Sequence, residues 1–258
     1  GQGGLFDSSF VRRGRHDATV PYEPGACLDL RRCPTRPGAA RHNECVSTPS
    51  IPFTPAADVT AHAATIDVGR IAHELRHHEV TDVLVSGVER AAYSSDASLY
   101  RVLPRAIVRP RRTDDVLETL AVARSLGVPI TARGAGTSCA GNAVGPGIVM
   151  DFSTHMNKVL DLDVANRRAV VEPGAVHQSL QRAVLPHGVR FGPDPSSHTR
   201  CTIGGMIGNN ACGSRAFAYG KTSDNLLSLE MATAGGELVR LDHGASRDAL
   251  TAAHPYLG

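Results

Sequence analysis

A glycine-rich loop directly follows a short β-branched run near the middle of this chain, and the pair is suited to binding phosphate. The apolar run predicts a strand, and Gly134 and Gly136 come immediately after it. Because glycine has no Cβ, the backbone can turn sharply there and a ligand can approach the peptide plane. Exposed amides, with the hydroxyls of Thr137 and Ser138, form a concavity for phosphate oxygens. Arg133 either adds a positive charge to that site or pairs with a carboxylate of the fold.

Two familiar phosphate-binding motifs do not match. The dinucleotide fingerprint G-x-G-x-x-G fails because Cys139 stands where its third glycine belongs, and the glycines from 141 to 147 leave no room for the helix that should follow. The phosphate loop of nucleotide hydrolases fails too, because Arg215 occupies the position of its first glycine ahead of Gly220-Lys221-Thr222. A pyrophosphate bound by this chain therefore needs another scaffold.

A second glycine-rich stretch runs from 191 to 213. Pro193 and Pro195 fix an extended segment, and Thr202 is suited to cap the short helix that follows. Three glycines in that helix cost roughly 1 kcal/mol each relative to alanine, so they need a reason. Either backbone packs closely against backbone there, or a flat ring lies on the helix end with amides facing it.

The two glycine-rich stretches and a third motif, Tyr219 to Asn225, resemble the FAD-binding domain of the vanillyl-alcohol oxidase and p-cresol methylhydroxylase (PCMH-type) superfamily in order and spacing. Within it they resemble most the branch of D-lactate, glycolate and D-2-hydroxyglutarate dehydrogenases, over about Tyr93 to Leu241. The resemblance implies an α+β fold: a two-lobed PCMH-type FAD-binding domain with the cofactor between the lobes. Some members bind flavin covalently through a loop histidine. The loop from 133 to 141 has no histidine, so we expect non-covalent FAD.

The resemblance also implies a set of cofactor-contacting residues, whereas no catalytic residue and no metal ligand is assigned. Asp194 has two roles open to it, since it either bonds the cofactor or caps the Pro-Ser turn. Asn209 and Asn210 likewise either contact the flavin edge or end the helix. The expected cofactor-binding residues are Pro110, Arg133, Gly134, Ala135, Gly136, Thr137, Ser138, Pro193, Asp194, Ser196, Thr202, Gly204, Gly205, Gly208, Asn209, Asn210, Gly213, Tyr219 and Gly220.

The elements that must position these residues alternate between helical and strand periodicity, which suits two small α+β lobes. Helical spacing follows residue 66 and recurs in two later segments, and two pairs of apolar runs flank turns as hairpins. The expected strands are 106–110 and 147–151, the expected helices 116–123 and 176–184, and the expected hairpins 158–172 and 226–241.

The chain divides into four parts by composition. Residues 1–60 are rich in glycine, proline and arginine and show no apolar periodicity, so they are expected to be a disordered leader. Residues 61–104 form an entry helix and a lead-in segment, and residues 105–245 form the PCMH-type FAD-binding domain. Residues 246–258 are expected to be a truncated C-terminal tail.

Composition excludes several classes of protein. A net charge of +2 gives no bulk electrostatic basis for nucleic-acid binding, although the arginines of the leader leave a polyanion-binding protein as an alternative. No apolar run reaches the roughly 18 residues of a membrane helix. The six cysteines form no C-x-x-C pair, which favours a reducing compartment, so the protein is expected in the cytoplasm or peripheral to the inner membrane.

The resemblance implies a flavin-dependent oxidoreductase, in which a D-2-hydroxy acid gives its C2 hydride to FAD and an electron acceptor takes the electrons. In the family the base and the substrate-binding groups belong to a capping domain, which would begin near the end of this chain. The chain is therefore expected to be the FAD-binding portion of such an enzyme. One alternative is a module without activity of its own that needs a separate or missing substrate and iron–sulfur domain. Another is a flavin reductase of cell-wall precursor synthesis, against which the stretch from Thr202 to Gly213 argues.

Overall fold

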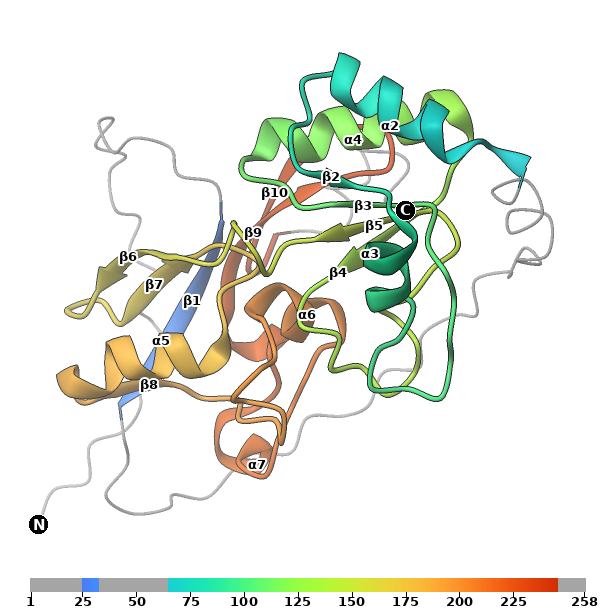
Figure 1. The fold of residues 1–258 in the computed structure, drawn as a ribbon. Helices are drawn as coiled ribbons and strands as arrows, with labels where there is room; N and C mark the ends of the chain where they lie inside the picture. Colours follow the sequence, from blue (N-terminus) through green and yellow to red (C-terminus); the bar gives the residue numbers. More distant parts are fainter. Residues whose placement is uncertain (1–24, 33–64, 246–258) are drawn as a thin grey trace, which may run out of the picture.

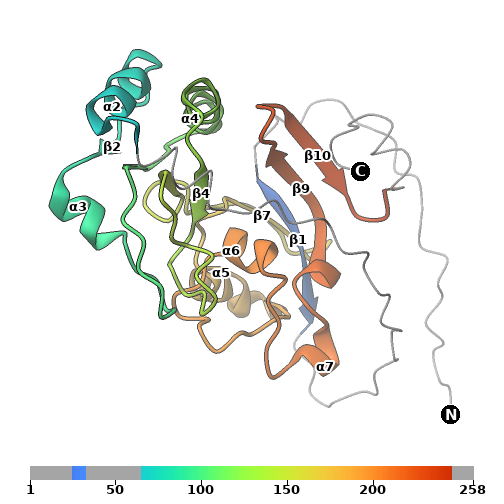
Figure 2. The ribbon, with the colours of Figure 1, turned by 90° about the vertical axis from the view of Figure 1, so that its right-hand side faces the viewer.

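The computed structural model describes residues 25–32 and 65–245, which form two lobes (Figures 1 and 2). A four-stranded sheet with helices on it makes the first lobe, and a six-stranded antiparallel sheet with helices makes the second. This confirms the predicted α+β class. In the described part of the chain, no helix is both long and apolar enough to span a membrane.

The first lobe is built on strands in the order β2-β3-β5-β4, of which β3, β5 and β4 run parallel. Helices α2 and α4 lie side by side on this sheet and bury their apolar faces against it (Figure 1). Gly127 ends α4 in the left-handed conformation, with φ of 64°. The elements are α2 (Val68–His77), β2 (Val83–Leu84), α3 (Gly87–Ala92), β3 (Ala106–Val108), α4 (Thr113–Leu126), β4 (Ile130–Arg133) and β5 (Ile148–Asp151).

The second lobe has the strand order β10-β9-β1-β7-β6, and β8 pairs with β1. Both predicted hairpins are confirmed, since β6 pairs with β7 and β9 with β10. The elements are β1 (Ala26–Arg32), β6 (Val159–Asp163), β7 (Arg168–Val171), α5 (His177–Val184), the 3-10 turn η1 (Leu185–His187), β8 (Val189–Phe191), α6 (Ile203–Gly208), α7 (Ala216–Tyr219), η2 (Ser223–Asn225), β9 (Leu226–Ala232) and β10 (Leu238–Asp242).

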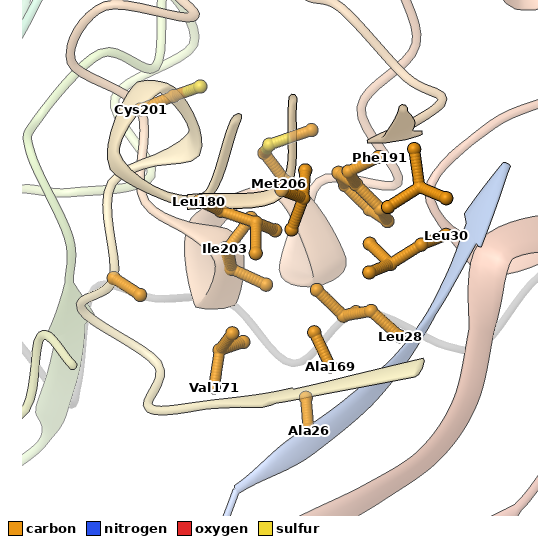
Figure 3. Close-up of a cluster of buried hydrophobic side chains, with 13 residues drawn as sticks. Ala26, Leu28, Leu30, Ala169, Val171, Leu180, Phe191, Cys201, Ile203 and Met206 are labelled. Carbon is orange, nitrogen blue, oxygen red and sulfur yellow. The ribbon is translucent and has the colours of Figure 1, made fainter. Parts of the chain in front are cut away.

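The core of the second lobe joins β1 to the glycine-rich helix α6. Leu28 and Leu30 of β1 are fully buried in one cluster with Ile203 and Met206 of α6 and with Phe191 (Figure 3). The apolar side chains of α6 therefore anchor the helix on the sheet, while its glycines are free to serve another surface.

One expectation is wrong: the segment from 1 to 60 is not irregular throughout, because residues 26–32 form β1. Ala26, Leu28 and Leu30 alternate with Cys27 and Asp29, and only the first set is buried. This period of two is typical of a strand, but it is short and stands among prolines and arginines. Residues 1–24 and 33–60 of the expected leader, with the tail from 246 to 258, lie outside the described residues.

Candidate cofactor-binding site

A long cleft between the two lobes is lined by about half of the residues expected to bind a cofactor. It consists of three adjoining cavities of about 840, 510 and 440 Å³, and Ala132 lines all three. Gly134 of the loop after β4 and Gly204 of α6 face the same cavity. The two glycine-rich stretches, which are far apart in the sequence, thus meet across one cleft.

Ten of the nineteen expected residues line this cleft. Those from the first lobe belong to the end of β4 and the loop after it, and those from the second lobe belong to α6 and its two flanking residues. They are Arg133, Gly134, Gly136, Thr137, Ser138, Thr202, Gly204, Gly205, Gly208 and Asn209.

The other nine lie outside the walls of these cavities, and several of them hold neighbouring loops instead. The Asp194 carboxylate accepts from the backbone N–H of Arg215 at 3.1 Å and forms an ion pair with its side chain at 3.0 Å. The Asn210 side chain accepts from the N–H of Ser223 at 3.1 Å. The nine are Pro110, Ala135, Pro193, Asp194, Ser196, Asn210, Gly213, Tyr219 and Gly220.

The loop and α6 touch directly at Gly134. A Cβ at this position would overlap Oγ1 of Thr202, so only glycine lets the loop lie this close to the helix. The same Oγ1 caps α6 as predicted, because it accepts from the N–H of Gly205 at 3.2 Å. The first amides of α6 and the amides of the loop are thereby brought to one place.

The glycines of α6 serve two different purposes. A Cβ on Gly204 would lie 2.8 Å from the carbonyl oxygen of Pro173, so this glycine allows close packing of backbone on backbone. A Cβ on Gly208 would meet nothing within 4 Å, although Gly208 lines the cleft. No described residue occupies the space beside Gly208, so this position leaves the wall of the cleft open.

Substitution of Gly208 by valine is expected to weaken FAD binding at least tenfold, because the side chain would enter the cleft. The same change should leave the thermal midpoint of the apo-protein unchanged or slightly higher, since glycine costs a helix roughly 1 kcal/mol relative to alanine and valine recovers part of that cost. Titration calorimetry with FAD and thermal unfolding without it measure the two effects. Equal FAD affinity in the variant and the wild type would show that the space at 208 is not used.

Arg133 neither projects a free charge at the site nor pairs with a carboxylate. Its guanidinium donates to the backbone carbonyls of Ser95 and Ala143, both at 3.0 Å, and reaches that of Tyr93 at 3.5 Å. It also lies 5.2 Å from the centre of the Tyr93 ring. Arg133 therefore ties the lead-in segment to both ends of the glycine loop.

Tyr93 is itself held in place by a buried carboxylate. Its hydroxyl donates to Asp151 at 2.7 Å, and Asp151 is buried at the end of β5. Burial and this hydrogen bond raise the pKa of Tyr93 to about 12, so the hydroxyl stays protonated and remains a donor. The loop thus rests on a preformed frame from the first lobe.

Substitution of Arg133 by glutamine is expected to lower FAD affinity about tenfold, because one side-chain amide cannot serve three separated carbonyls. The salt dependence of FAD binding should stay as in the wild type, since Arg133 does not neutralise phosphate in this arrangement. FAD affinity measured between 50 and 500 mM salt tells whether Arg133 holds the loop or binds phosphate. A shallower salt dependence in the variant would identify Arg133 as a phosphate ligand.

A large apolar part of the cleft was not predicted from the sequence. Val116 and Leu120 of α4 line it together with Leu229 and Met231 of β9, and so does Pro173, which follows β7. Arg124 of α4 donates to the carbonyl of Ala234 at 3.1 Å and joins the lobes there. These apolar residues carry no chemical signature, and only the fold places them opposite one another.

A buried histidine holds the segment that leads into the second glycine stretch. Nε2 of His177 lies 2.8 Å from the carbonyl oxygen of Pro193, and the Gln181 side chain donates to that of Phe191 at 2.6 Å. Burial lowers the pKa of His177, so the imidazole is neutral in the folded protein.

Stability should therefore fall as the pH drops below about 6.5, because the unfolded chain then binds a proton at His177 that the folded chain does not. At this pH, His177 alone makes the free energy of unfolding change by up to about 1.4 kcal/mol per pH unit. Substitution by glutamine should flatten the fall in urea midpoint between pH 7 and pH 5, whereas glutamine at the exposed His187 should not. An unchanged slope in the His177 variant would refute this assignment.

Comparison with known proteins agrees with this geometry. The sequence profile of the family described as FAD binding domain matches residues 104–242. The D-2-hydroxyglutarate dehydrogenase of Pseudomonas putida is 40% identical over 154 residues, or 57% of this chain and 15% of that protein. Glycolate oxidase subunit GlcD of Bacillus subtilis is 37% identical over 165 residues, or 63% of this chain and 35% of that protein. The chain thus spans well under half the length of these relatives.

Solved structures show the same fold. An alkyldihydroxyacetonephosphate synthase superposes with a TM-score of 0.61 at 22% identity, covering 70% of this chain and 40% of its own. BBE-like 1 of Physcomitrella patens superposes with a TM-score of 0.60 at 21% identity, with the same shares covered. Because the family match covers more than half of the residues, this chain belongs to the FAD-binding domain family of the PCMH-type superfamily, and FAD is its cofactor.

Proposed function

We propose that this chain is the FAD-binding portion of an oxidoreductase that oxidises a D-2-hydroxy acid, such as D-lactate, glycolate or D-2-hydroxyglutarate, and passes the electrons to a separate acceptor. The observation that carries this proposal is the cleft in which the loop at Gly134 faces α6. Relatives named D-2-hydroxyglutarate dehydrogenase and glycolate oxidase support the substrate class.

The described residues fit the cofactor by shape and by polarity. The loop amides with the hydroxyls of Thr137 and Ser138 would hold the pyrophosphate, and the open face at Gly208 would accept the flat flavin ring. The apolar cavity between α4 and β9 would exclude water from the rest of the bound cofactor. Bound FAD would supply the hydride acceptor. With no histidine in the loop from 133 to 141, binding is non-covalent in this proposal.

The proton of the substrate hydroxyl needs an acceptor, and the two polar cavities are lined by no carboxylate or imidazole among the described residues. Their titratable groups are Arg133, Cys139 and Cys201, and burial raises the pKa of Cys201. The base would therefore come from elsewhere in the complete enzyme. The alternative is a module without activity of its own that serves a separate substrate or iron–sulfur subunit.

The proposal is tested on the purified 258-residue chain and on a longer protein that contains it. The chain should show the two visible flavin bands and release its flavin to the supernatant on acid denaturation. A D-2-hydroxy acid should bleach the flavin of the longer protein but not that of the chain alone. Failure of D-lactate, glycolate and D-2-hydroxyglutarate alike to bleach the FAD-loaded longer protein would overturn the substrate class. Recovery of activity when a separate subunit is added would establish the alternative.

A further inference from the structure

Residues 152–158 carry the chain from β5 of the first sheet to β6 of the second, and this segment is the interlobe linker (Figure 1). Two of its side chains belong to the wall of the cleft. Phe152 and Met156 line the largest cavity, and Phe152 also lines the cavity that Gly134 shares with α6. The position of the interlobe linker therefore affects the shape of the cleft.

His155 ties the interlobe linker to the first lobe through a carboxylate. Nε2 of His155 lies 2.7 Å from Oδ2 of Asp82, which directly precedes β2 and has only 10% of its side chain exposed. Oδ1 of Asp82 accepts from Nε and Nη2 of Arg109 at 2.9 and 2.8 Å, and Arg109 directly follows β3. Two neighbouring strand ends thus hold Asp82 in place, and Asp82 in turn gives the linker a fixed point in the first lobe.

The interlobe linker is also bonded to the second lobe. The carbonyl of Met156 accepts from the N–H of Gly174 at 2.7 Å. The N–H of Lys158 donates to the carboxylate of Glu172 at 2.7 Å, and the N–H of Glu172 donates to the carbonyl of Lys158 at 3.0 Å. A Cβ on Gly174 would overlap the carbonyl of Phe152, so the linker lies directly against this segment of the second lobe.

The segment that the interlobe linker contacts also supports α6. The carbonyl of Pro173 accepts from the N–H of Gly204 at 2.8 Å, and the carbonyl of Ala175 accepts from the N–H of Ile203 at 2.8 Å. A continuous set of hydrogen bonds therefore leads from Asp82 through the linker to the first residues of α6. Because α6 forms one wall of the cleft and the loop at Gly134 the other, a shift of the linker would change their separation.

We propose that His155 is a positioning residue for FAD: its contact with Asp82 fixes the interlobe linker, and the linker fixes α6 at the correct distance from the glycine loop. His155 is not among the described residues that line the three cavities, so it acts through the linker and not by touching the cofactor. The proposal concerns FAD binding and does not depend on which substrate the complete enzyme oxidises.

The test compares two side-chain amides at position 155 that differ by one methylene group. In His155→Gln the amide reaches the place of Nε2 and can still donate to Asp82, whereas in His155→Asn it is too short. Both variants keep a polar group beside Asp82, which also retains Arg109, so the first lobe should stay folded. His78→Leu is the matched control, because it removes a contact of the same 2.7 Å between His78 and Glu118, which lie outside the linker and the cleft.

We expect His155→Asn to bind FAD about tenfold more weakly, which is the loss of one hydrogen bond to a charged group, and the other two variants to stay within about twofold of the wild type. In the purified chain before FAD is added, hydrogen exchange at the amides of Gly174 and Gly204 should be faster in His155→Asn, while β3 keeps its protection.

Wild-type FAD affinity in His155→Asn would overturn the proposal, and so would unchanged exchange at both glycine amides. Equal weakening in His155→Gln would assign the effect to the packing of the imidazole ring and contradict the role of the hydrogen bond. Equal weakening in His78→Leu would assign it to a general loss of stability, which also contradicts the proposal. None of these measurements uses a substrate, so their failure is distinct from a failure of the D-2-hydroxy acids to bleach the flavin.

Discussion

Substitution of Gly134 by alanine is expected to lower FAD affinity about 100-fold while leaving both lobes folded. The added Cβ would overlap Oγ1 of Thr202, so the loop must move away from α6. Such a shift would lengthen the hydrogen bonds that we propose between the loop amides and the pyrophosphate. Two bonds to a charged group, at about 1.5 kcal/mol each, correspond to about 100-fold in affinity. FAD titration followed by flavin fluorescence measures the change, and circular dichroism verifies the fold.

A second substitution tests the cause directly. Thr202→Gly removes the obstructing side chain and costs α6 only a few tenths of a kcal/mol, since glycine is an acceptable cap. The double variant Gly134→Ala, Thr202→Gly should therefore bind FAD more tightly than Gly134→Ala alone. If the two effects simply add, the contact between Gly134 and Thr202 does not position the loop. Gly87→Ala is a matched control, because a Cβ there meets nothing within 4 Å and the residue lies outside the cleft.

Local chemistry explains why the two glycine-rich stretches are readable from sequence. Both stretches are visible as clusters of glycine next to a predicted strand end or a predicted helix cap, and the structure places Gly134 and Gly208 on the wall of one cavity. Thr202 is likewise a helix cap by residue type, and the structure confirms it. A residue whose role is settled by its own backbone or its near neighbours can be predicted in this way.

Roles that depend on distant partners are not readable in the same way. A guanidinium can donate to phosphate, carboxylate or carbonyl oxygens, and the choice at Arg133 depends on how residues 93–95 fold against the loop. β1 depends on β7 and β9, which lie more than a hundred residues further along the chain. The alternation of apolar and polar residues in β1 is short and therefore a weak signal in the sequence. The strand is stabilised by pairing with distant strands, which the local sequence does not show.

Substitution of Leu28 by aspartate is expected to unfold the second lobe and abolish FAD binding. Leu28 has no exposed surface, and its neighbours Ile203 and Met206 offer no partner to a carboxylate. Burying an unpaired charge destabilises by more than about 4 kcal/mol, which approaches the total stability of about 5 to 15 kcal/mol of a typical domain. Leu28→Ala should cost about 2 to 5 kcal/mol and leave a weakened fold that still binds FAD at low temperature. Urea unfolding and flavin retention measure these losses.

The neighbouring residue provides the control, because the strand alternates between its two faces. Asp29→Asn removes only the partly exposed ion pair with Arg31, so its effect should stay within about 1 kcal/mol. Hydrogen exchange identifies the lobe that fails: β7 and β9 should lose protection in the Leu28→Asp variant, while β3 and β5 keep it. Because β3 and β5 belong to the other sheet, loss of protection there as well would mean that the lobes unfold as one unit. If the Leu28→Asp variant kept the urea midpoint and the flavin content of the wild type, β1 would not be part of the folded core.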